Sequence, residues 1–224
     1  MAQFDVISQE GVQFVKVTLK DDSFRAEAGA LSFMTGNIAI RPQLPLVGGM
    51  IRSMYSGEAM VRPLYRGTGV VYLESSFNDF YVFDLSGETW ILNRGTYWAS
   101  DDEIHLSYNR EPMLASFWTG EGLIDYRTKV SGRGKVVLAC PGPVEERTLK
   151  NERVTAEGGF VIARTEGVRY GVRRVTTFFR SLLSGEAFVR TYEGTGRVLI
   201  SSTPLWRAQL AKKLGISIGA NDVS

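Results

Sequence analysis

Alternation of apolar and polar positions is the clearest pattern near the start of the chain. From Phe14 to Lys20, Val15, Val17 and Leu19 alternate with polar residues. A period of two is typical of a strand with one face buried. The segment 4–7 is short and mostly apolar, which predicts an additional edge strand.

A second pattern recurs three times along the chain. In each copy, two apolar pairs four residues apart precede a Gly-Glu step, and a Gly-x-Gly follows about ten residues later. The apolar pairs predict a short helix, and the Gly-x-Gly predicts a tight turn between two strands. The glycines of the Gly-Glu steps lie 63 and 65 residues apart. The copies are residues 50–58 with 67–69, 113–121 with 132–134, and 178–186 with 194–196.

Another signature precedes each copy and keeps the same period. A leucine lies ten residues before a glycine, and polar residues between the two predict a hairpin. After the glycine, the chain is expected to form a short strand, at Leu31–Met34, Tyr97–Ala99 and Phe160–Ala163. Two signatures with one period indicate an internal triplication. The positions that define the repeat are Gly29, Gly95, Gly159, Gly57, Glu58, Gly120, Glu121, Gly185, Glu186, Gly67, Gly69, Gly132, Gly134, Gly194 and Gly196.

These patterns predict an all-β protein of three tandem repeats of about 64 residues, at about 12–78, 79–141 and 142–204. A unit of this size buries only about 60% of its unfolded surface, so the repeats are expected to pack together into a single unit over residues 1–204. Residues 205–224 depart from the pattern. Thr203 and Pro204 are suited to begin a helix and Gly215 to end it, which predicts a C-terminal helix and tail.

Composition excludes several classes of protein. A formal net charge of +2 over 224 residues does not favour wholesale binding to nucleic acid or to a membrane. One cysteine excludes an intramolecular disulfide framework, and no apolar run is long enough for a transmembrane segment. No signal peptide is visible. We therefore expect a cytoplasmic location.

The repeated motifs, together with Ala26-Glu27-Ala28-Gly29-Ala30, resemble the altered-inheritance-of-mitochondria 24 family over about residues 12–204. Its prokaryotic members form a conserved family of unknown function. The resemblance implies all-β modules, β-sandwich or double-stranded β-helix-like, related to the fold of the tryptophan RNA-binding attenuation protein (TRAP-like), with short helices. It also implies a homo-oligomer, with a trimer as the expected form. It transfers no catalytic residue and no cofactor.

Isolated reactive residues do not form a catalytic pattern. His105 is the single histidine, and Cys140 is the single cysteine. A cysteine nucleophile normally needs a histidine base, and these two lie 35 residues apart, so a buried structural cysteine and a histidine in a solvated loop are favoured. The recurring glutamates Glu58, Glu121 and Glu186 could converge on a cation, but backbone hydrogen bonds or arginine pairing explain them better. No metal site or cofactor is predicted.

The strongest candidate for binding is a basic stretch at 169–180. It carries arginines among aromatic residues, a pattern that could hold phosphates and stack bases. A solvated strand face with glutamate partners is the simpler interpretation. The candidate residues are Arg169, Arg173, Arg174 and Arg180.

We therefore expect a non-catalytic oligomeric structural or scaffolding protein. One alternative is a ligand or nucleic-acid binding module that uses residues 169–180. A further alternative is a peripheral membrane protein that docks through the C-terminal helix.

Overall fold

The computed structural model describes residues 1–9, 12–42, 62–74, 79–112, 124–156, 160–174 and 188–201. Every regular element in this part of the chain is a β-strand. The all-β prediction is therefore confirmed for the described residues. The short helices predicted near 50–55, 113–118 and 178–183, and the C-terminal helix, lie outside them.

Twelve strands are described. The first six are β1 (Gln3–Gln9), β2 (Val12–Ala26), β3 (Leu31–Arg41), β4 (Leu64–Leu73), β5 (Asp79–Leu92) and β6 (Tyr97–Asp101). The others are β7 (His105–Pro112), β8 (Ile124–Cys140), β9 (Val144–Ala156), β10 (Val161–Thr165), β11 (Val168–Arg174) and β12 (Phe188–Ser201).

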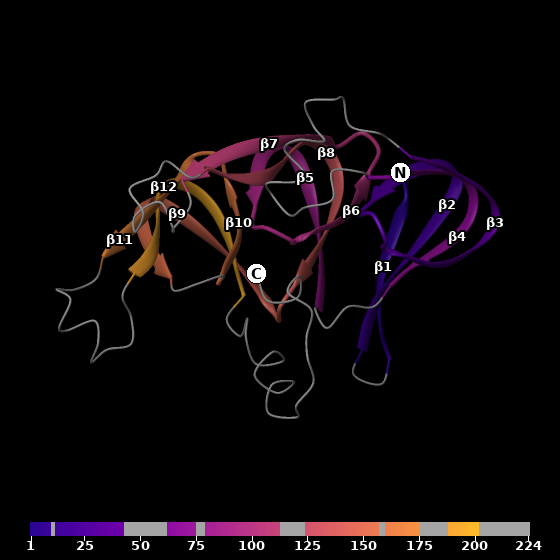
Figure 1. Cartoon of the computed structure of the whole chain (residues 1–224), viewed down its shortest axis with the longest axis horizontal. Coiled ribbons are helices and arrows are strands. Elements are labelled where there is room, and N and C mark those ends of the chain that lie inside the picture. Colours follow the sequence, from indigo (N-terminus) through magenta and orange to yellow (C-terminus); the bar gives the residue numbers. More distant parts are fainter. Residues whose placement is uncertain are drawn as a thin grey trace.

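The strands form one antiparallel sheet with the order β11-β12-β10-β5-β8-β6-β2-β4-β3, while β1 pairs with β2, β7 with β8 and β9 with β12. We divide it into an N-terminal group (β1–β4), a central group (β5–β8) and a C-terminal group (β9–β12). The groups follow one another along the long axis of the molecule, with β3 near one end and β11 near the other (Figure 1). The order in space thus follows the order in sequence.

Each group is built on one pair of long strands. β2 pairs with β4, β5 with β8 and β9 with β12, and each ladder has a register shift near its middle, at Leu19/Asp22, Ser86/Thr89 and Gly194/Thr195. The N-terminal half of β2 also shows the predicted alternation, because Val15, Val17 and Leu19 are buried. The expected edge strand is present as β1.

The pairing of these strands shows that the two predicted turns are wrong. β2 continues through Asp21-Asp22, and β4 continues through Gly67-Thr68-Gly69. Neither signature is a hairpin turn. They lie opposite each other as mid-strand bends, with Asp22 paired to Gly67 and Leu19 to Gly69.

A close approach of two backbones explains the glycines at these bends. Gly67 has a φ of +146°, and a Cβ atom there would lie 2.0 Å from the carbonyl oxygen of Asn37 on β3. Gly69 would similarly place a Cβ atom 2.1 Å from the carbonyl oxygen of Thr35. Only glycine allows β3 to pass this close.

Neighbouring groups are joined by short strands. β6 of the central group pairs with the end of β2, and β10 of the C-terminal group pairs with the end of β5. Three apolar clusters lie around Phe24, Trp90 and Val198, and the first two also include buried residues of the following group, such as Val137 and Ile162. Both the sheet and its apolar packing are therefore continuous across the junctions.

Candidate functional site

A small hollow lies at the junction of the central and C-terminal groups. Its walls come from β5, β7, β8, β10, β11 and β12, and its volume of about 20 Å³ is enough for a water molecule but not for a substrate. The residues that line it are Ile91, Leu92, Asn93, Glu111, Arg127, Val161, Ile162, Ala163, Arg164, Tyr170 and Tyr192.

Glu111 on β7 is the centre of a buried ion cluster beside this hollow. The Arg164 guanidinium donates to its carboxylate, and the Asn109 amide donates to the same oxygen over 3.1 Å. Arg127 Nε lies 3.7 Å from the other oxygen. The side chains of Glu111 and Arg164 are each only 8% exposed. Water therefore screens this pair much less than it screens a surface pair.

The remaining contacts of the arginines link separate strands. Arg164 donates to the carbonyl oxygen of Val168 over 2.6 Å, and Arg127 donates to the side-chain oxygen of Asn93. The guanidinium groups are thus engaged by the protein itself. Chemically, the cluster is suited to hold β7, β8 and β10 together.

Tyrosine in this hollow is poorly suited to acid–base chemistry near neutral pH. Burial raises the pKa of Tyr192 to about 12, although Arg190 opposes this effect. Its hydroxyl is therefore neutral at physiological pH. The ring lies beside that of Tyr170, with centroids 5.7 Å apart, and contributes to packing.

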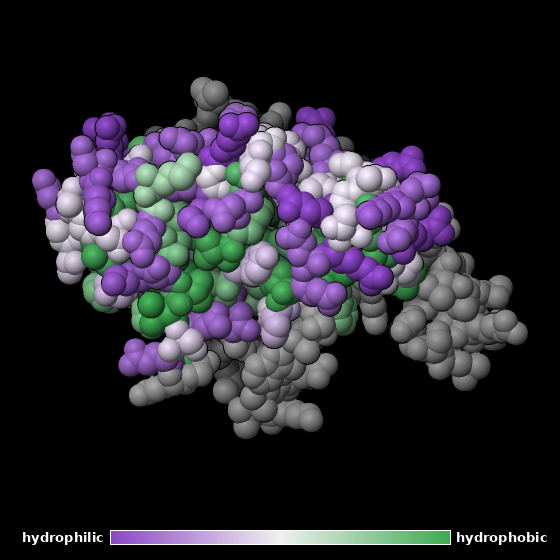
Figure 2. Space-filling view, turned by 180° about the vertical axis from the view of Figure 1, so that it is seen from behind, coloured by the Kyte–Doolittle hydropathy of each residue, from purple (hydrophilic) through white to green (hydrophobic). Residues whose placement is uncertain are grey.

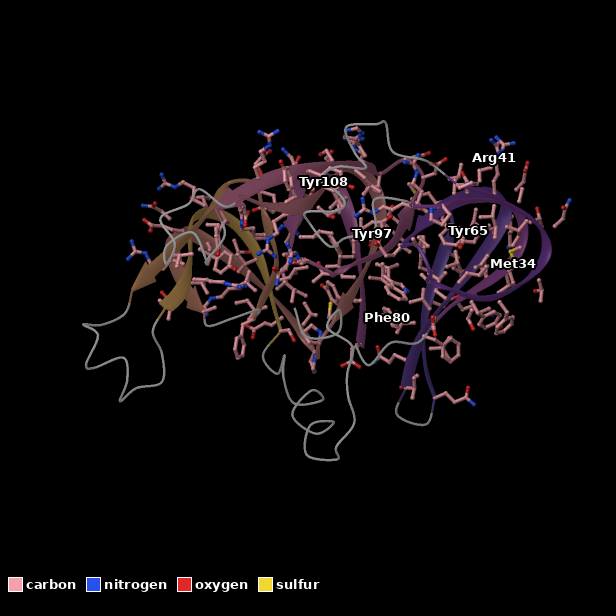
Figure 3. The ribbon with its side chains drawn as sticks, in the orientation of Figure 1. Met34, Arg41, Tyr65, Phe80, Tyr97 and Tyr108 are labelled. Atoms are coloured by element: carbon pink, nitrogen blue, oxygen red, sulfur yellow. The ribbon has the colours of Figure 1, made fainter. Side chains whose placement is uncertain are left out.

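A second buried arginine, Arg62, lies at the junction of the N-terminal and central groups. It donates to the Tyr108 hydroxyl and to the Thr128 hydroxyl, each over 2.9 Å. Its Nε lies 3.4 Å from a carboxylate oxygen of Glu27, and its guanidinium carbon lies 4.5 Å from the ring centroid of Tyr97. Tyr97 and Tyr108 lie close together in Figure 3, in the middle of the molecule.

Arg62 therefore ties β2 and β4 to the central group. Burial raises the pKa of Tyr97 to about 12, against the opposing effect of Arg62. The same junction has a more exposed link, in which Arg25 contacts the carboxylate of Asp102 at 2.6 Å.

Sequence reasoning missed Arg62, Arg127, Arg164 and Glu111. A signal for two of them was present, because Arg62 and Arg127 each lie five residues before the first glycine of a Gly-x-Gly. The partners could not be found in this way, since Arg164 and Glu111 are 53 residues apart.

The predicted basic stretch is only partly described. Arg169 lies exposed on β11, which is at the end of the sheet order, and pairs in register with Glu193. Arg173 and Arg174 are at the end of the same strand, but their side chains lie outside the described part of the structure, as does the whole of Arg180. Arg169 is thus the one candidate of the four whose side chain the structure describes.

Cys140 and His105 are far apart in environment as well as in sequence. Cys140 is completely buried, and its thiol lies 3.7 Å from the carbonyl oxygen of Leu138. Burial strongly raises the pKa of this thiol, which disfavours the nucleophilic thiolate. His105 is exposed at the start of β7 rather than in the predicted loop, paired in register with Ser131. The described residues contain no group of three potential metal ligands.

Most of the glycines that define the repeat are described, and Gly29, Gly67, Gly69, Gly95, Gly132, Gly134, Gly194 and Gly196 all have positive φ. Gly57, Gly120, Gly159 and Gly185, with Glu58, Glu121 and Glu186, lie outside the described residues. No helix capable of crossing a membrane occurs in the part of the chain that the structure describes.

Residues 4–203 match the family described as Mitochondrial biogenesis AIM24. The chain belongs to the AIM24 family. The match extends from β1 beyond the end of β12, so it includes all three strand groups. The family predicted from the repeated motifs is therefore confirmed.

Two individual proteins are also similar to this chain. An uncharacterized protein of Streptococcus pyogenes serotype M6 is 24% identical over 190 residues, which cover 80% of this chain and 76% of that protein. A crystal structure of a Streptococcus pyogenes protein superposes with a TM-score of 0.70 at 24% identity, over 96% of this chain and 99% of that one. This likeness supports the fold of the AIM24 chain along nearly its whole length.

Proposed function

We propose that this AIM24-family chain is a non-catalytic structural protein that acts as a homo-oligomeric scaffold. In this proposal the three strand groups are equivalent modules, at about 12–78, 79–141 and 142–204, with the TRAP-like relationship inferred from the motifs. The expected stoichiometry is a trimer.

Recurring backbone contacts support the equivalence of the modules. In each group, the strand that follows the repeat glycine (β3, β6 or β10) pairs with β4, β8 or β12 through a register shift. The shifts lie at Leu31/Phe33, Tyr97/Ala99 and Val161/Ala163. A hydrogen bond then closes each group at the same place. These bonds run from the amides of Glu74, Ala139 and Ser201 to the carbonyl oxygens of Ala30, Thr96 and Phe160, over 2.6, 2.8 and 2.8 Å.

The observation that carries the proposed function is the way in which charged side chains are used at the junctions. Glu111 and Arg164 are buried between groups and contact each other, and Arg62 is buried against Tyr97 and Tyr108. Such groups fix the relative position of the elements they join. A sheet held in this way presents a fixed surface, which is what a scaffold requires.

Sedimentation velocity over a hundredfold range of protein concentration tests this proposal. A scaffold made of several copies should sediment as one species heavier than the 24.9 kDa chain. A protein that remains monomeric at every concentration would contradict it.

The basic stretch supports one alternative function, because Arg169 is exposed beside the half-buried ring of Tyr170. A nucleic-acid binding module would show binding that weakens steeply with salt and weakens again in Arg169→Ala. Fluorescence anisotropy with a labelled single-stranded oligonucleotide measures this directly. Binding of that kind by the wild-type protein would favour the alternative over the scaffold.

A further inference from the structure

Each end of the sheet exposes a short segment whose counterparts in the other strand groups are buried. We call Leu31–Thr35 of β3 the head edge and Val154–Ala156 of β9 the tail edge. Among the described strands, β3 pairs only with β4, and β9 only with β12. Phe33 is 54% exposed and Met34 is 38% exposed. Figure 3 shows Met34 at the right-hand end of the molecule, in the N-terminal group.

The corresponding segments of the other groups are covered. Counted from Gly29, Gly95 and Gly159, Phe33 and Met34 correspond to Ala99 and Ser100 of β6 and to Ala163 and Arg164 of β10. All four counterparts are at least 93% buried. The tail edge corresponds in the same way to Phe24–Ala26 and Trp90–Leu92. Val154 and Ala156 are only half-buried, whereas their counterparts are at most 1% exposed. These counterparts are Phe24, Ala26, Trp90 and Leu92.

Inside the molecule, these two kinds of segment pair with each other. Ala26 pairs with Ala99 and Arg25 with Ser100, in antiparallel register. One group further along, Leu92 pairs with Ala163 and Ile91 with Arg164.

Each pairing is extended by one more backbone hydrogen bond. The amide of Glu27 donates to the carbonyl oxygen of Trp98, and the amide of Asn93 donates to that of Ile162, both over 2.7 Å. The same joint therefore occurs twice in one chain.

We propose that the tail edge of one copy pairs with the head edge of a second copy, forming this joint a third time. The register of the two internal joints places Ala156 opposite Phe33, Thr155 opposite Met34 and Val154 opposite Thr35. The inference rests on the proposed homo-oligomer and identifies its interface.

A second copy fits the head edge for three reasons. The two terminal groups lie at opposite ends of the long axis, so the tail edge of the same chain does not reach its own head edge (Figure 1). An unpaired strand edge is a template for another strand. The small side chain of Ala156 leaves room for the ring of Phe33, which is stacked on Tyr72 at a centroid distance of 4.3 Å.

The apolar side chains of β3 point to the same occupant. Phe33, Met34 and Ile40 are three of the five large hydrophobic residues exposed in the described part of the chain. Pairing would cover Phe33 and Met34 as their counterparts are covered. Figure 2 shows the molecule from behind, where hydrophobic side chains gather in patches bordered by hydrophilic ones. Because head and tail are different surfaces, the contact is heterologous, and a closed ring gives every copy the same two neighbours.

Disulfide trapping between two single variants tests the register. One variant carries Met34→Cys, and the other carries Thr155→Cys together with a size tag. The two are mixed, dissociated in mild denaturant, refolded together and oxidised. We expect a crosslink that joins one tagged and one untagged chain, identified by mass after tryptic digestion. Asn37→Cys replaces Met34→Cys in the control mixture, because it lies three residues further along β3, about 10 Å away. The buried Cys140 is present in every sample and is controlled by the wild-type protein.

The outcomes separate this inference from the proposed function. A mixed crosslink from Met34→Cys and none from Asn37→Cys supports the inference. Crosslinks between two Met34→Cys chains, or an oligomer without the mixed crosslink, would overturn the head-to-tail joint and leave the homo-oligomer standing. A monomer in sedimentation would overturn both.

A charge at the head edge gives an independent measurement. Phe33→Lys places an ammonium group opposite Ala156 and should weaken association roughly 100-fold, because an unpaired charge is costly to bury. Ile40→Lys is the matched control, since Ile40 is on the same strand, is 39% exposed and lies beyond the paired segment. Circular dichroism confirms that each variant is folded. Equal association of the two variants would contradict the inference.

Discussion

At the scale of residues, charged side chains inside the molecule should contribute more to stability than those on its surface. Arg62 is 5% exposed and contacts both of the groups it joins. The pair between Arg153 and Glu193 is shorter, at 2.7 Å, than the 3.4 Å between Arg62 and Glu27, but its side chains are 42% and 39% exposed. Solvent screens the second pair, so the two arginines should differ in their contribution to stability.

Substitution of Arg62 tests this difference. Arg62→Ala removes the buried guanidinium and leaves Glu27 without this cation, so we expect the free energy of unfolding to fall by about 3–5 kcal/mol. Arg153→Ala should change it by less than about 1 kcal/mol. Urea denaturation followed by tryptophan fluorescence measures both. A similar loss in the two variants would show that burial of Arg62 is unimportant.

Two buried tyrosines and the buried cysteine predict that the stability of the fold falls at alkaline pH. Burial raises the pKa of Tyr97 and Tyr192 from 10.0 to about 12 and raises that of Cys140 above its ordinary 9.0. From pH 9 upward, the unfolded chain therefore loses protons that the folded chain retains. Rising pH then favours unfolding. The contribution of the two tyrosines is fully present below about pH 10 and lost by about pH 12, whereas that of Cys140 begins to fall near pH 9.

Urea denaturation at a series of pH values between 8 and 11 checks whether stability falls with pH and which residue causes the fall. The wild-type protein should lose stability across this range. Tyr192→Phe should show a shallower slope, because it removes one of the groups that titrate. An unchanged slope would mean that Tyr192 does not contribute.

At the scale of elements, the sequence predicted the strands better than their connections. The alternation of Val15, Val17 and Leu19 identified β2, because one face of that strand packs on the core. The Gly-x-Gly segments by themselves predict turns, because glycine with positive φ is typical of turns. In the structure, the glycines of β4 instead allow β3 to approach. Which strand passes closest is a property of the fold and is absent from local sequence.

Alanine at Gly67 tests the close approach. The new Cβ atom would lie 2.0 Å from the carbonyl oxygen of Asn37, so β3 and β4 must separate. Gly29→Ala is a matched control, because its φ of +84° is also positive but no atom lies within 4 Å of the added carbon. Backbone strain alone should make Gly29→Ala cost about 1–2 kcal/mol.

We expect Gly67→Ala to lower the free energy of unfolding by clearly more than Gly29→Ala does. Urea denaturation of the two variants side by side gives the comparison. Equal losses would indicate that positive φ alone explains both glycines.

At the scale of the whole molecule, the sequence indicated the triplicated pattern and the family but not how the groups are joined. The junction pairs Arg164–Glu111 and Arg62–Glu27 connect residues 53 and 35 positions apart, and no local pattern predicts such partners. The same holds for the strand edges at the two ends, which become visible only when the pairing of every other strand is known. The proposed scaffold function therefore depends on architecture more than on any single side chain.

Native mass spectrometry of the freshly purified protein is the most direct test of that account. A scaffold made from copies of this chain should give a single assembly whose mass is a whole multiple of 24.9 kDa, with three copies expected and no additional bound mass. A 24.9 kDa monomer as the dominant species, or an assembly that reproducibly retains a nucleotide or oligonucleotide, would contradict it.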